Sequence, residues 1–403
     1  MAIRRILFAA YGGGHIRMLL PVLDALRDRT DIDCKVLALT TAARAVSDAA
    51  YEPLGFHDFI EQGDGPALEI GRRLAAELGG NQIIPLDHTI AYMGLSYRDM
   101  IDRHGEVEAA RLYAEKGRWY FHPYPTISRI LKRIVPDLIV TTNAPRAERA
   151  LVEAASDQGI PALCLGDLFL DFEWEWCALP GFGDYIGVMS QSVRQHLIEK
   201  GRPAEEIVVT GNPAFDCISD TEVIEAGAAI RAAAGWDENP VIMWAMPAIP
   251  PGDKRIAPVG PTLAAMKALS ERRPDLRFIL RPHPNVTENL EGFTDQFRIS
   301  HRFENVHSVI HASDLVVTEF STVGLEGALA GKPVISIASK NIIPYEELGI
   351  TYEIDHAGQL GDAIERVLAN GNATRLDLLG APEPGEATGN VVRLIDQMLG
   401  ESR

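Results

Sequence analysis

The sequence predicts an α/β protein with two doubly wound, Rossmann-like domains that face an interdomain cleft. The first observation is a pair of loops about 300 residues apart, Ala-Tyr-Gly-Gly-Gly-His at 10–15 and Glu-Phe-Ser-Thr-Val-Gly at 319–324. Each follows a short apolar run typical of a buried parallel strand and precedes a helical pattern. Backbone N–H groups at such helix starts can bind an anion. The second observation is length, because 403 residues exceed what one core usually holds.

In the first half of the chain, apolar runs alternate with helical patterns, which is typical of right-handed βαβ units. Residues 64–125 interrupt this alternation, and we predict a largely helical insertion there that covers the cleft side of the first domain. The first domain is placed at residues 1–206. Its strands are expected at 6–10, 34–39, 137–142, 162–165 and 185–189, with helices at 19–26, 42–50 and 146–158.

The second half repeats the alternation. Strand 207–210 leads into a Gly-Asn-Pro turn whose proline cannot join a central ladder, so the domain junction is placed just before this strand. The second domain is expected at 207–385, and the segment 386–403 as a C-terminal helix packing back on the first domain. Further strands are expected at 241–245, 278–281, 315–318 and 333–337, with helices at 261–272, 306–312 and 324–330.

Composition excludes several classes of protein. The net charge of -18 argues against a nucleic-acid partner, because phosphate binding requires a basic face. No run of about 18 apolar residues is present, so no transmembrane helix is expected. The four cysteines lack a CxxC spacing and the start lacks an export signal, which predicts a cytoplasmic protein. Peripheral contact with the inner face of the cell membrane stays open, with the aromatic residues 119–124 as the candidate surface or as part of the core.

Four stretches, in this order, resemble the GT-B superfamily. They are the glycine turn with His15, Val-Thr-Gly-Asn-Pro at 209–213, Arg-Pro-His-Pro-Asn at 281–285, and the segment 312–334 from Ala-Ser-Asp to Gly-Lys-Pro-Val. The first two stretches resemble the N-acetylglucosaminyltransferase that makes lipid II and the UDP-N-acetylglucosamine 2-epimerases. The His-Pro pair and the Phe-Ser-Thr loop resemble bacterial sialyl-, Kdo- and glycerophosphotransferases. The resemblance implies a nucleotide-sugar substrate, with no metal or other cofactor.

The resemblance also implies that the second domain binds the donor. The hydroxyls of Ser321 and Thr322 would donate to a phosphate, and the helix dipole favours an anion there by about 0.3–1 kcal/mol. Glu326 would bind the ribose, and His283 would neutralise the leaving diphosphate as a catalytic residue. The competing interpretations are a simple N-cap, an exposed helix glutamate and a structural histidine. The candidate donor- and phosphate-binding residues are Ser321, Thr322, Glu326, Arg281, Gly211 and Asn212.

In the first domain, His15 opens a helix after three glycines and is a candidate general base or acceptor contact. Asp167, at the end of strand 162–165, is the other candidate base. The competing interpretation of His15 is a helix-capping side chain. The carboxylates at 171, 173 and 175 are more simply interpreted as a solvated loop. The candidate acceptor-side residues are Gly12, Gly13, Gly14, Asn143 and Arg146, with Glu148 beside them.

Other chemistries find little support. The chain has no Walker loop, GxSxG elbow or HExxH pair. An Asp-x-Asp pair, the usual divalent-metal anchor in another large transferase fold, occurs as Asp31 and Asp33. This pair enters a strand, and ligands bind at the opposite end of parallel strands. We therefore interpret it as a solvated turn and expect no metal.

The residues and the resemblance together predict a metal-independent GT-B glycosyltransferase that inverts the anomeric configuration. The resemblance implies a role in bacterial surface glycan or glycolipid synthesis. Its partners would be a nucleotide-sugar donor and a sugar or lipid-linked acceptor. The alternative is a UDP-N-acetylglucosamine 2-epimerase or a nucleotide-sugar hydrolase, which uses the same diphosphate site without an acceptor. Against it, the first turn lacks the Arg-Pro-Glu of epimerases and the second loop lacks their Asp-Ser-Gly-Gly. A third class is a catalytically silent nucleotide-sugar-binding subunit.

Overall fold

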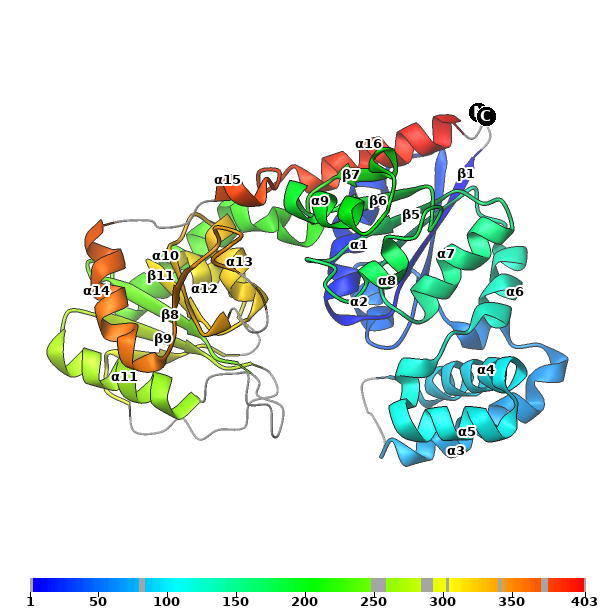
Figure 1. Cartoon of the computed structure of the whole chain (residues 1–403), viewed down its shortest axis with the longest axis horizontal. Helices are drawn as coiled ribbons and strands as arrows, with labels where there is room; N and C mark the ends of the chain where they lie inside the picture. Colours follow the sequence, from blue (N-terminus) through cyan, green and yellow to red (C-terminus); the bar gives the residue numbers. More distant parts are fainter. Residues whose placement is uncertain are drawn as a thin grey trace. The chain divides into compact units, whose positions relative to one another are not determined.

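The chain divides into two compact units in the computed structural model (Figure 1). Unit 1 comprises Met1–Ala214 and Glu386–Arg403, and unit 2 comprises Phe215–Gly385. The structure describes residues 3–79, 84–247, 259–283, 293–301, 304–339, 343, 345–370 and 376–401.

Unit 1 is built on a parallel sheet. Its strands follow the order β3-β2-β1-β4-β5-β6-β7, which places β1 at the point where the strand order reverses. Such a reversal is where doubly wound sheets bind ligands, beyond the carboxyl ends of the strands. The strands are β1 (Arg4–Ala10), β2 (Ile32–Ala38), β3 (Pro53–Leu54), β4 (Leu138–Thr142), β5 (Ala162–Leu165), β6 (Tyr185–Val188) and β7 (Ile207–Val209).

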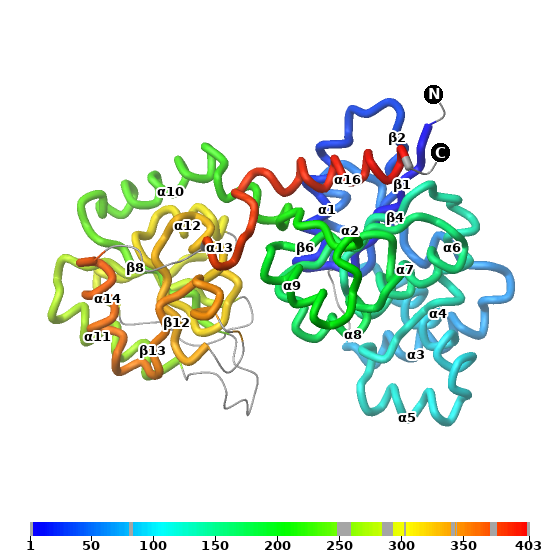
Figure 2. Tube along the Cα trace, turned by 45° about the horizontal axis from the view of Figure 1, so that its top comes forward, coloured from blue at the N-terminus to red at the C-terminus, as the bar shows by residue number. Residues whose placement is uncertain are grey.

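Helices cover this sheet, and the last helix of the chain is one of them. Helix α16 lies beside α1 in unit 1 (Figure 2). The unit 1 helices are α1 (Gly13–Leu26), α2 (Ala42–Asp48), α6 (Tyr124–Ile134), α7 (Ala147–Asp157), α8 (Trp174–Cys177), α9 (Gln191–Glu199) and α16 (Ala387–Glu401).

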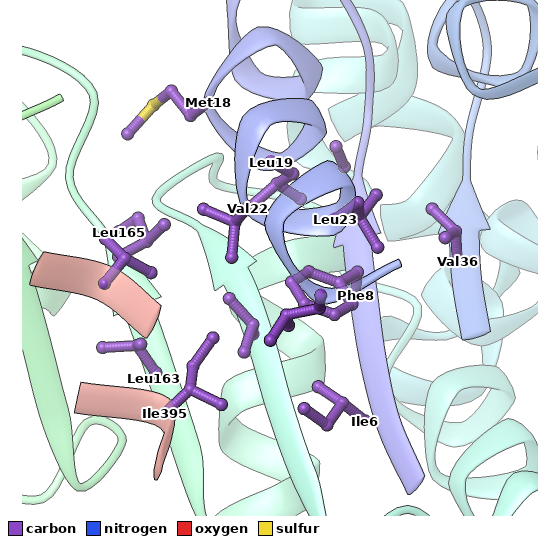
Figure 3. Packing of buried hydrophobic residues seen from close by; sticks show 14 of the residues in the cluster. Ile6, Phe8, Met18, Leu19, Val22, Leu23, Val36, Leu163, Leu165 and Ile395 are labelled. Carbon is purple, nitrogen blue, oxygen red and sulfur yellow. The ribbon is translucent and has the colours of Figure 1, made fainter. Parts of the chain in front are cut away.

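The core on one face of the sheet explains this arrangement. Ile6 and Phe8 are two residues apart on β1, so their side chains point to the same face of the sheet. They pack against Leu19 and Leu23 of α1 (Figure 3). Ile395 of α16 completes the same cluster. Fully burying side chains of this size contributes about 1.5–3 kcal/mol each, so the C-terminal helix is held in unit 1 by its apolar face.

The segment between β3 and α6 forms a helical layer, with α3 (Gly65–Glu77), α4 (Leu86–His104) and α5 (Glu106–Lys116). Helices α3 and α4 cross closely because glycines lie at the contact: a Cβ at Gly71 would collide with the Ile90 carbonyl oxygen, and one at Gly94 with that of Ala67. Tyr92 of α4 lies with its ring centroid 5.5 Å from that of Tyr11. The inserted helices therefore reach the glycine turn.

Unit 2 is a second parallel sheet, with the strand order β10-β9-β8-β11-β12-β13. Its core lies between α11, α14 and one face of the sheet, while α10, α12 and α13 pack together (Figure 1). The strands are β8 (Val241–Ala245), β9 (Arg277–Arg281), β10 (Phe297–Ile299), β11 (Leu315–Thr318), β12 (Val334–Ile337) and β13 (Tyr352–Ile354). The helices are α10 (Thr221–Ala234), α11 (Val259–Arg272), α12 (Val306–His311), α13 (Thr322–Leu329), α14 (Leu360–Asn370) and α15 (Leu376–Leu379).

The predicted fold class of two doubly wound domains is confirmed, but the division falls later than the predicted 206/207. Strand β7 hydrogen-bonds to β6 in the first sheet, and unit 1 continues to Ala214. Gly211 and Asn212, predicted on the donor side, therefore belong to unit 1. The reason is that β7 is the last strand of the first sheet, while the next strand along the chain, β8, begins at Val241 in the second sheet.

Candidate functional site

The first candidate site is the unit 1 edge, by which we mean the residues that follow the carboxyl ends of β1, β4, β5 and β7. Strands β1 and β4 are paired in register, Ala9 beside Thr141. Residues just beyond them therefore share one edge of the sheet. The unit 1 edge comprises Tyr11, Gly12, Gly13, Gly14, His15, Thr142, Asn143, Arg146, Glu148, Asp167, Gly211 and Asn212.

The glycine turn opens α1 without a side-chain cap. Gly12 has φ 145°, and a Cβ there would collide with the Thr41 hydroxyl, so this position requires glycine. Gly13 also has positive φ, and its N–H donates to Thr41 Oγ1 at 3.3 Å. Gly14 is exposed with open space around its Cα. The start of α1 is thus a bare backbone surface, as an anion or a sugar would require.

Glu148 is the most buried carboxylate of the unit 1 edge, with 1% of its surface exposed. One oxygen, Oε1, accepts the Tyr11 backbone N–H at 2.5 Å, which ties α7 to the glycine turn. Burial raises the pKa of Glu148, while the charges of His15 and Arg146 act in the opposite direction. The carboxyl therefore holds a proton more readily than an exposed glutamate does, which favours a role in proton exchange.

Four buried polar atoms of the unit 1 edge, one of them on Glu148 itself, lack a hydrogen-bond partner among the described residues. They are Nδ1 of His15, Oγ1 of Thr142, Nε of Arg146 and Oε2 of Glu148. The Arg146 guanidinium carbon lies 3.8 Å from the centroid of the Tyr11 ring, which orients it. A buried polar atom without a partner costs about 1–3 kcal/mol, so a group of them points to a polar ligand or bound water.

Asp167 is held by its neighbours on the same edge. Its Oδ1 accepts Asn143 Nδ2 at 3.0 Å and the Leu168 N–H at 2.8 Å, and its own N–H donates to Asn143 Oδ1 at 3.1 Å. Asn212 Nδ2 donates to the Asp167 carbonyl at 2.6 Å. Asn143, Asp167 and Asn212, predicted as separate contacts, thus form one hydrogen-bond network that links the ends of β4, β5 and β7.

The nearby acidic loop is less solvated than predicted. Glu173 is half-buried at the start of α8, and burial raises its pKa, with the charge of Asp167 acting in the same direction. Trp176 is buried, whereas Asp171 and Glu175 are exposed. The alternation of aromatic and acidic residues builds a short helix here, which the sequence pattern did not indicate.

The second candidate site is the unit 2 loop, by which we mean residues 319–326, from the end of β11 into the first turns of α13. Ser321 is the N-cap of α13, and its Oγ accepts the Val323 N–H at 3.3 Å. Its own N–H donates to Thr318 Oγ1 at 3.0 Å, and the Tyr345 hydroxyl donates to its carbonyl at 3.1 Å. The predicted N-cap role is therefore present, and a phosphate role for Ser321 and Thr322 stays a prediction.

Glu319 opens the unit 2 loop, and no sequence pattern marked its carboxyl as a candidate functional group. It has 1% of its surface exposed, accepts Trp244 Nε1 at 3.1 Å, and lies 3.4 Å from the Thr262 hydroxyl. Burial raises the pKa of Glu319 to about 8, although both hydrogen bonds oppose this shift. A neutral carboxyl thus lies directly behind the loop at neutral pH.

Glu326 is buried, in contrast to the exposed helix glutamate of the competing interpretation. His307 of α12 donates through Nε2 to Glu326 Oε2 at 2.7 Å, and its Nδ1 lies 3.2 Å from Cys217 Sγ. Burial by itself would lower the pKa of His307, but its bonds to Cys217 and Glu326 raise it to about 9. The predicted ribose contact is thus linked to a histidine and a thiol, and its ribose role stays a prediction.

Arg281 and His283 follow β9. Arg281 donates to Ser300 Oγ at 2.8 Å, to the His301 carbonyl at 2.5 Å and to the Glu304 carbonyl at 2.9 Å. These bonds hold the chain around β10, so Arg281 has a structural role in the fold, and its donor-binding role stays a prediction. His283 is exposed at the end of the described stretch, and its catalytic role stays a prediction.

The Asp-x-Asp pair lies at the opposite end of the unit 1 strands. Asp31 accepts two hydrogen bonds from Arg29 at 2.8 Å, and Asp33 accepts Arg5 Nε at 2.8 Å. Both carboxylates thus have ion-pair partners in the fold. Among the described helices, none is long and apolar enough to cross a membrane.

Comparison with known proteins fits this architecture. A family model described as UDP-N-acetylglucosamine 2-epimerase matches residues 182–342, which is less than half of the chain. No curated protein matches the chain by sequence.

Solved structures match it over nearly its whole length. A putative UDP-N-acetylglucosamine 2-epimerase from Listeria monocytogenes has a TM-score of 0.64 at 14% identity, covering 99% of this chain and 98% of its own. The UDP-GlcNAc 2-epimerase from Neisseria meningitidis, bound to UDP-GlcNAc, has a TM-score of 0.59 at 13% identity over 98% and 100%. A glycosyltransferase from Streptomyces nogalater has a TM-score of 0.51 at 15% identity over 98% and 100%. The predicted resemblance is confirmed at the level of the fold: this chain has a GT-B fold like that of UDP-GlcNAc 2-epimerases, with glycosyltransferases as more distant neighbours.

Proposed function

We propose that the protein is an enzyme that epimerises a UDP-N-acetylhexosamine at C2. Unit 2 binds the nucleotide diphosphate through the start of α13, and the unit 1 edge supplies the acid and the base that act on the sugar. The observation that carries this proposal is the cluster of unpartnered buried polar atoms on His15, Thr142, Arg146 and Glu148. The sequence alone favoured glycosyl transfer, with epimerisation as the alternative, and we now propose epimerisation as the main function.

The chemistry of epimerisation suits this cluster. Inverting C2 removes the C2 proton, and the electron pair forms a C1=C2 double bond as the diphosphate leaves C1. A proton then adds to C2 from the opposite face as the diphosphate returns to C1, so a proton acceptor and a proton donor must both reach the sugar. Two such groups are available at the unit 1 edge. Burial raises the pKa of Glu148, His15 has a nitrogen without a hydrogen-bond partner among the described residues, and the charge of His15 acts on Glu148. Arg146 adds a cation for the diphosphate or a sugar oxygen.

The choice of a UDP-N-acetylhexosamine rests on similarity. The epimerase family model spans 182–342, a range that includes both Asn212 of the unit 1 edge and the whole unit 2 loop. The Neisseria meningitidis neighbour was solved with UDP-GlcNAc bound. A neutral Glu319 behind the loop also lowers the negative charge that a diphosphate would meet.

Glycosyl transfer from a nucleotide-sugar is the second candidate. It is favoured by the glycine turn without Arg-Pro-Glu, by the loop with Ser321 and Thr322 in place of Asp-Ser-Gly-Gly, and by the His-Pro pair at 283 and 284. In this reaction His15 or Asp167 would deprotonate an acceptor hydroxyl, and no proton on C2 would exchange.

One experiment separates the two. The purified enzyme is incubated in D₂O with UDP-, GDP-, CDP- and CMP-sugars without acceptor, and the products are followed by NMR. Our proposal predicts the C2 epimer of a UDP-N-acetylhexosamine carrying deuterium at C2. Slow UDP release with C2 unchanged would replace epimerisation by transfer. Asp31→Asn, at the far end of the sheet, is the matched control and should behave as wild type.

A further inference from the structure

Three side chains of unit 2, those of Cys217, His307 and Glu326, contact one another in series. Cys217, in the 3₁₀ turn η5 (Pro213–Ser219), lies with Sγ 3.2 Å from Nδ1 of His307. The other ring nitrogen of His307 contacts Glu326 at 2.7 Å. Cys217 is partly exposed, whereas His307 and Glu326 are buried. Cys217 is therefore the member of this series that lies nearest to solvent.

The contacts favour charge separation between the thiol and the ring. The Glu326 carboxylate accepts from Nε2 and stabilises the imidazolium form of His307. An imidazolium has a proton on both nitrogens, so Nδ1–H then points to sulfur and stabilises a thiolate. The pKa of His307, raised to about 9, agrees with this direction.

The other cysteines provide a contrast within the same chain. Cys34 is also partly exposed, but burial raises its pKa to about 11 and no imidazole contacts it among the described residues. Cys164 and Cys177 are buried, and burial raises the pKa of Cys177 well above its ordinary value. Buried thiols of this kind are inert, whereas a partly exposed thiol beside a cation reacts as the thiolate.

We propose that Cys217 is a modification site, a thiolate held against the His307–Glu326 pair that reacts with hydroperoxides. The sulfur attacks the hydroxyl oxygen of the peroxide and the O–O bond breaks. Sulfur is oxidised to sulfenic acid, and the peroxide is reduced to an alcohol or to water. The departing alkoxide or hydroxide takes the proton from Nδ1 of His307. The site is independent of the reaction proposed for the sugar.

The location gives the modification a consequence. Residues on both sides of Cys217 hold the segment where the chain leaves unit 2 again: Asp216 Oδ1 accepts the Gly385 N–H at 3.0 Å, and Ser219 Oγ donates to the Pro384 carbonyl at 3.2 Å. Glu326, at the other end of the contacts, lies on α13 and is the last residue of the unit 2 loop. After the reaction, Cys217 is a neutral sulfenic acid and His307 has given up a proton. The ionic attraction between His307 and the Glu326 carboxylate would therefore be lost.

The test is a competition between cysteines of one molecule. The full chain is exposed at pH 7 to hydrogen peroxide in the presence of dimedone, which traps sulfenic acid, and adduct formation is followed at each cysteine peptide by mass spectrometry. We expect Cys217 to be trapped at least about tenfold faster than Cys34, since reaction follows the thiolate fraction. This comparison requires no variant. Equal rates at Cys217 and Cys34 would overturn the proposal.

Two variants of α12 identify the cause. His307→Asn should lower the rate at Cys217 by about tenfold or more. His311→Asn is the matched control, because His311 lies one turn further on the same helix and contacts the Ile218 carbonyl at 2.7 Å instead of the thiol. It should leave the rate within about twofold of wild type. An unchanged rate in His307→Asn, with the native circular dichroism spectrum retained, would contradict the role of the imidazole.

Discussion

The two candidate sites differ in how far their polar groups are satisfied. At the unit 1 edge, buried atoms of His15, Thr142, Arg146 and Glu148 have no partner among the described residues. In the unit 2 loop, the buried carboxyl groups of Glu319 and Glu326 already accept hydrogen bonds from Trp244 and His307. The sheets behind them are alike in class and in parallel topology.

This difference suggests a division of labour. Unpartnered groups cost free energy in the absence of a ligand, and they are retained where a reacting group must be reached. Satisfied groups hold a loop in one conformation, so that the start of the helix behind it keeps a fixed position toward an anion. We infer that unit 1 acts on the substrate chemically and that unit 2 holds it.

The largest expected effect is a loss of turnover when Glu148 of the unit 1 edge is replaced. Glu148→Gln keeps an oxygen for the Tyr11 N–H but removes the proton that the carboxyl exchanges, so we expect turnover to fall by about 10²–10⁴-fold. Glu153→Gln is the control on the same helix α7, where the carboxylate is paired with His122 and Arg149. Steady-state kinetics of both variants measure the effect. Equal losses in the two would remove the special role of Glu148.

The next effect concerns the unit 2 loop. Ser321→Ala removes the cap of α13 and one phosphate donor, and we expect UDP affinity to fall about tenfold, or about 1.4 kcal/mol. Ser190→Ala is the control, because Ser190 caps α9 of unit 1 and accepts the Val193 N–H in the same way. Both changes should cost about 1 kcal/mol of stability. An equal loss of UDP affinity in Ser190→Ala would show that the cap acts only through stability.

Glu319 gives an effect on stability that depends on pH. Its pKa in the folded protein is about 8 against an ordinary 4.5, so the folded state keeps the proton that the unfolded state loses. Stability from this group is full below about pH 4.5 and falls as the pH rises to 8, by up to about 1.4 kcal/mol per pH unit. Glu319→Gln, which does not titrate, should therefore gain on wild type across this range in urea unfolding. A constant difference between pH 5 and 8 would refute the raised pKa.

The smallest expected effect is at the far end of the unit 1 sheet. Asp31 is partly exposed and paired with Arg29, and such surface pairs contribute about 0–1 kcal/mol. Asp31→Asn should leave turnover with and without added Mg²⁺ within about twofold of wild type. A magnesium-dependent reaction lost in this variant would restore the Asp-x-Asp interpretation.

Much of the fold could be predicted from the sequence because its central strands are buried on both faces. The predicted ranges 162–165, 241–245 and 315–318 coincide with β5, β8 and β11. The edge strands β10 and β13 and the helices α10 and α14 were not predicted. Short edge strands are only partly buried and carry a weak pattern, and α10 is Ala-rich with a single buried residue.

The site was predicted less completely, for a physical reason. The glycine turn, Asp167 and the unit 2 loop were found because they follow strands directly. The contact between Tyr11 and Glu148 joins residues 137 apart, and that of Cys217 with His307 joins residues 90 apart. Burial and pairing of this kind arise only when the sheet brings distant strand ends together, so no local spacing in the sequence indicates them.

The division of labour between the units is tested most directly by titrating Glu148→Gln with UDP in a calorimeter, beside wild type. The account predicts that UDP affinity stays within about twofold of wild type while turnover is lost, because UDP is held by unit 2 and the missing proton acts on the sugar. A fall in UDP affinity that matches the loss of turnover would contradict it, since Glu148 would then bind the nucleotide.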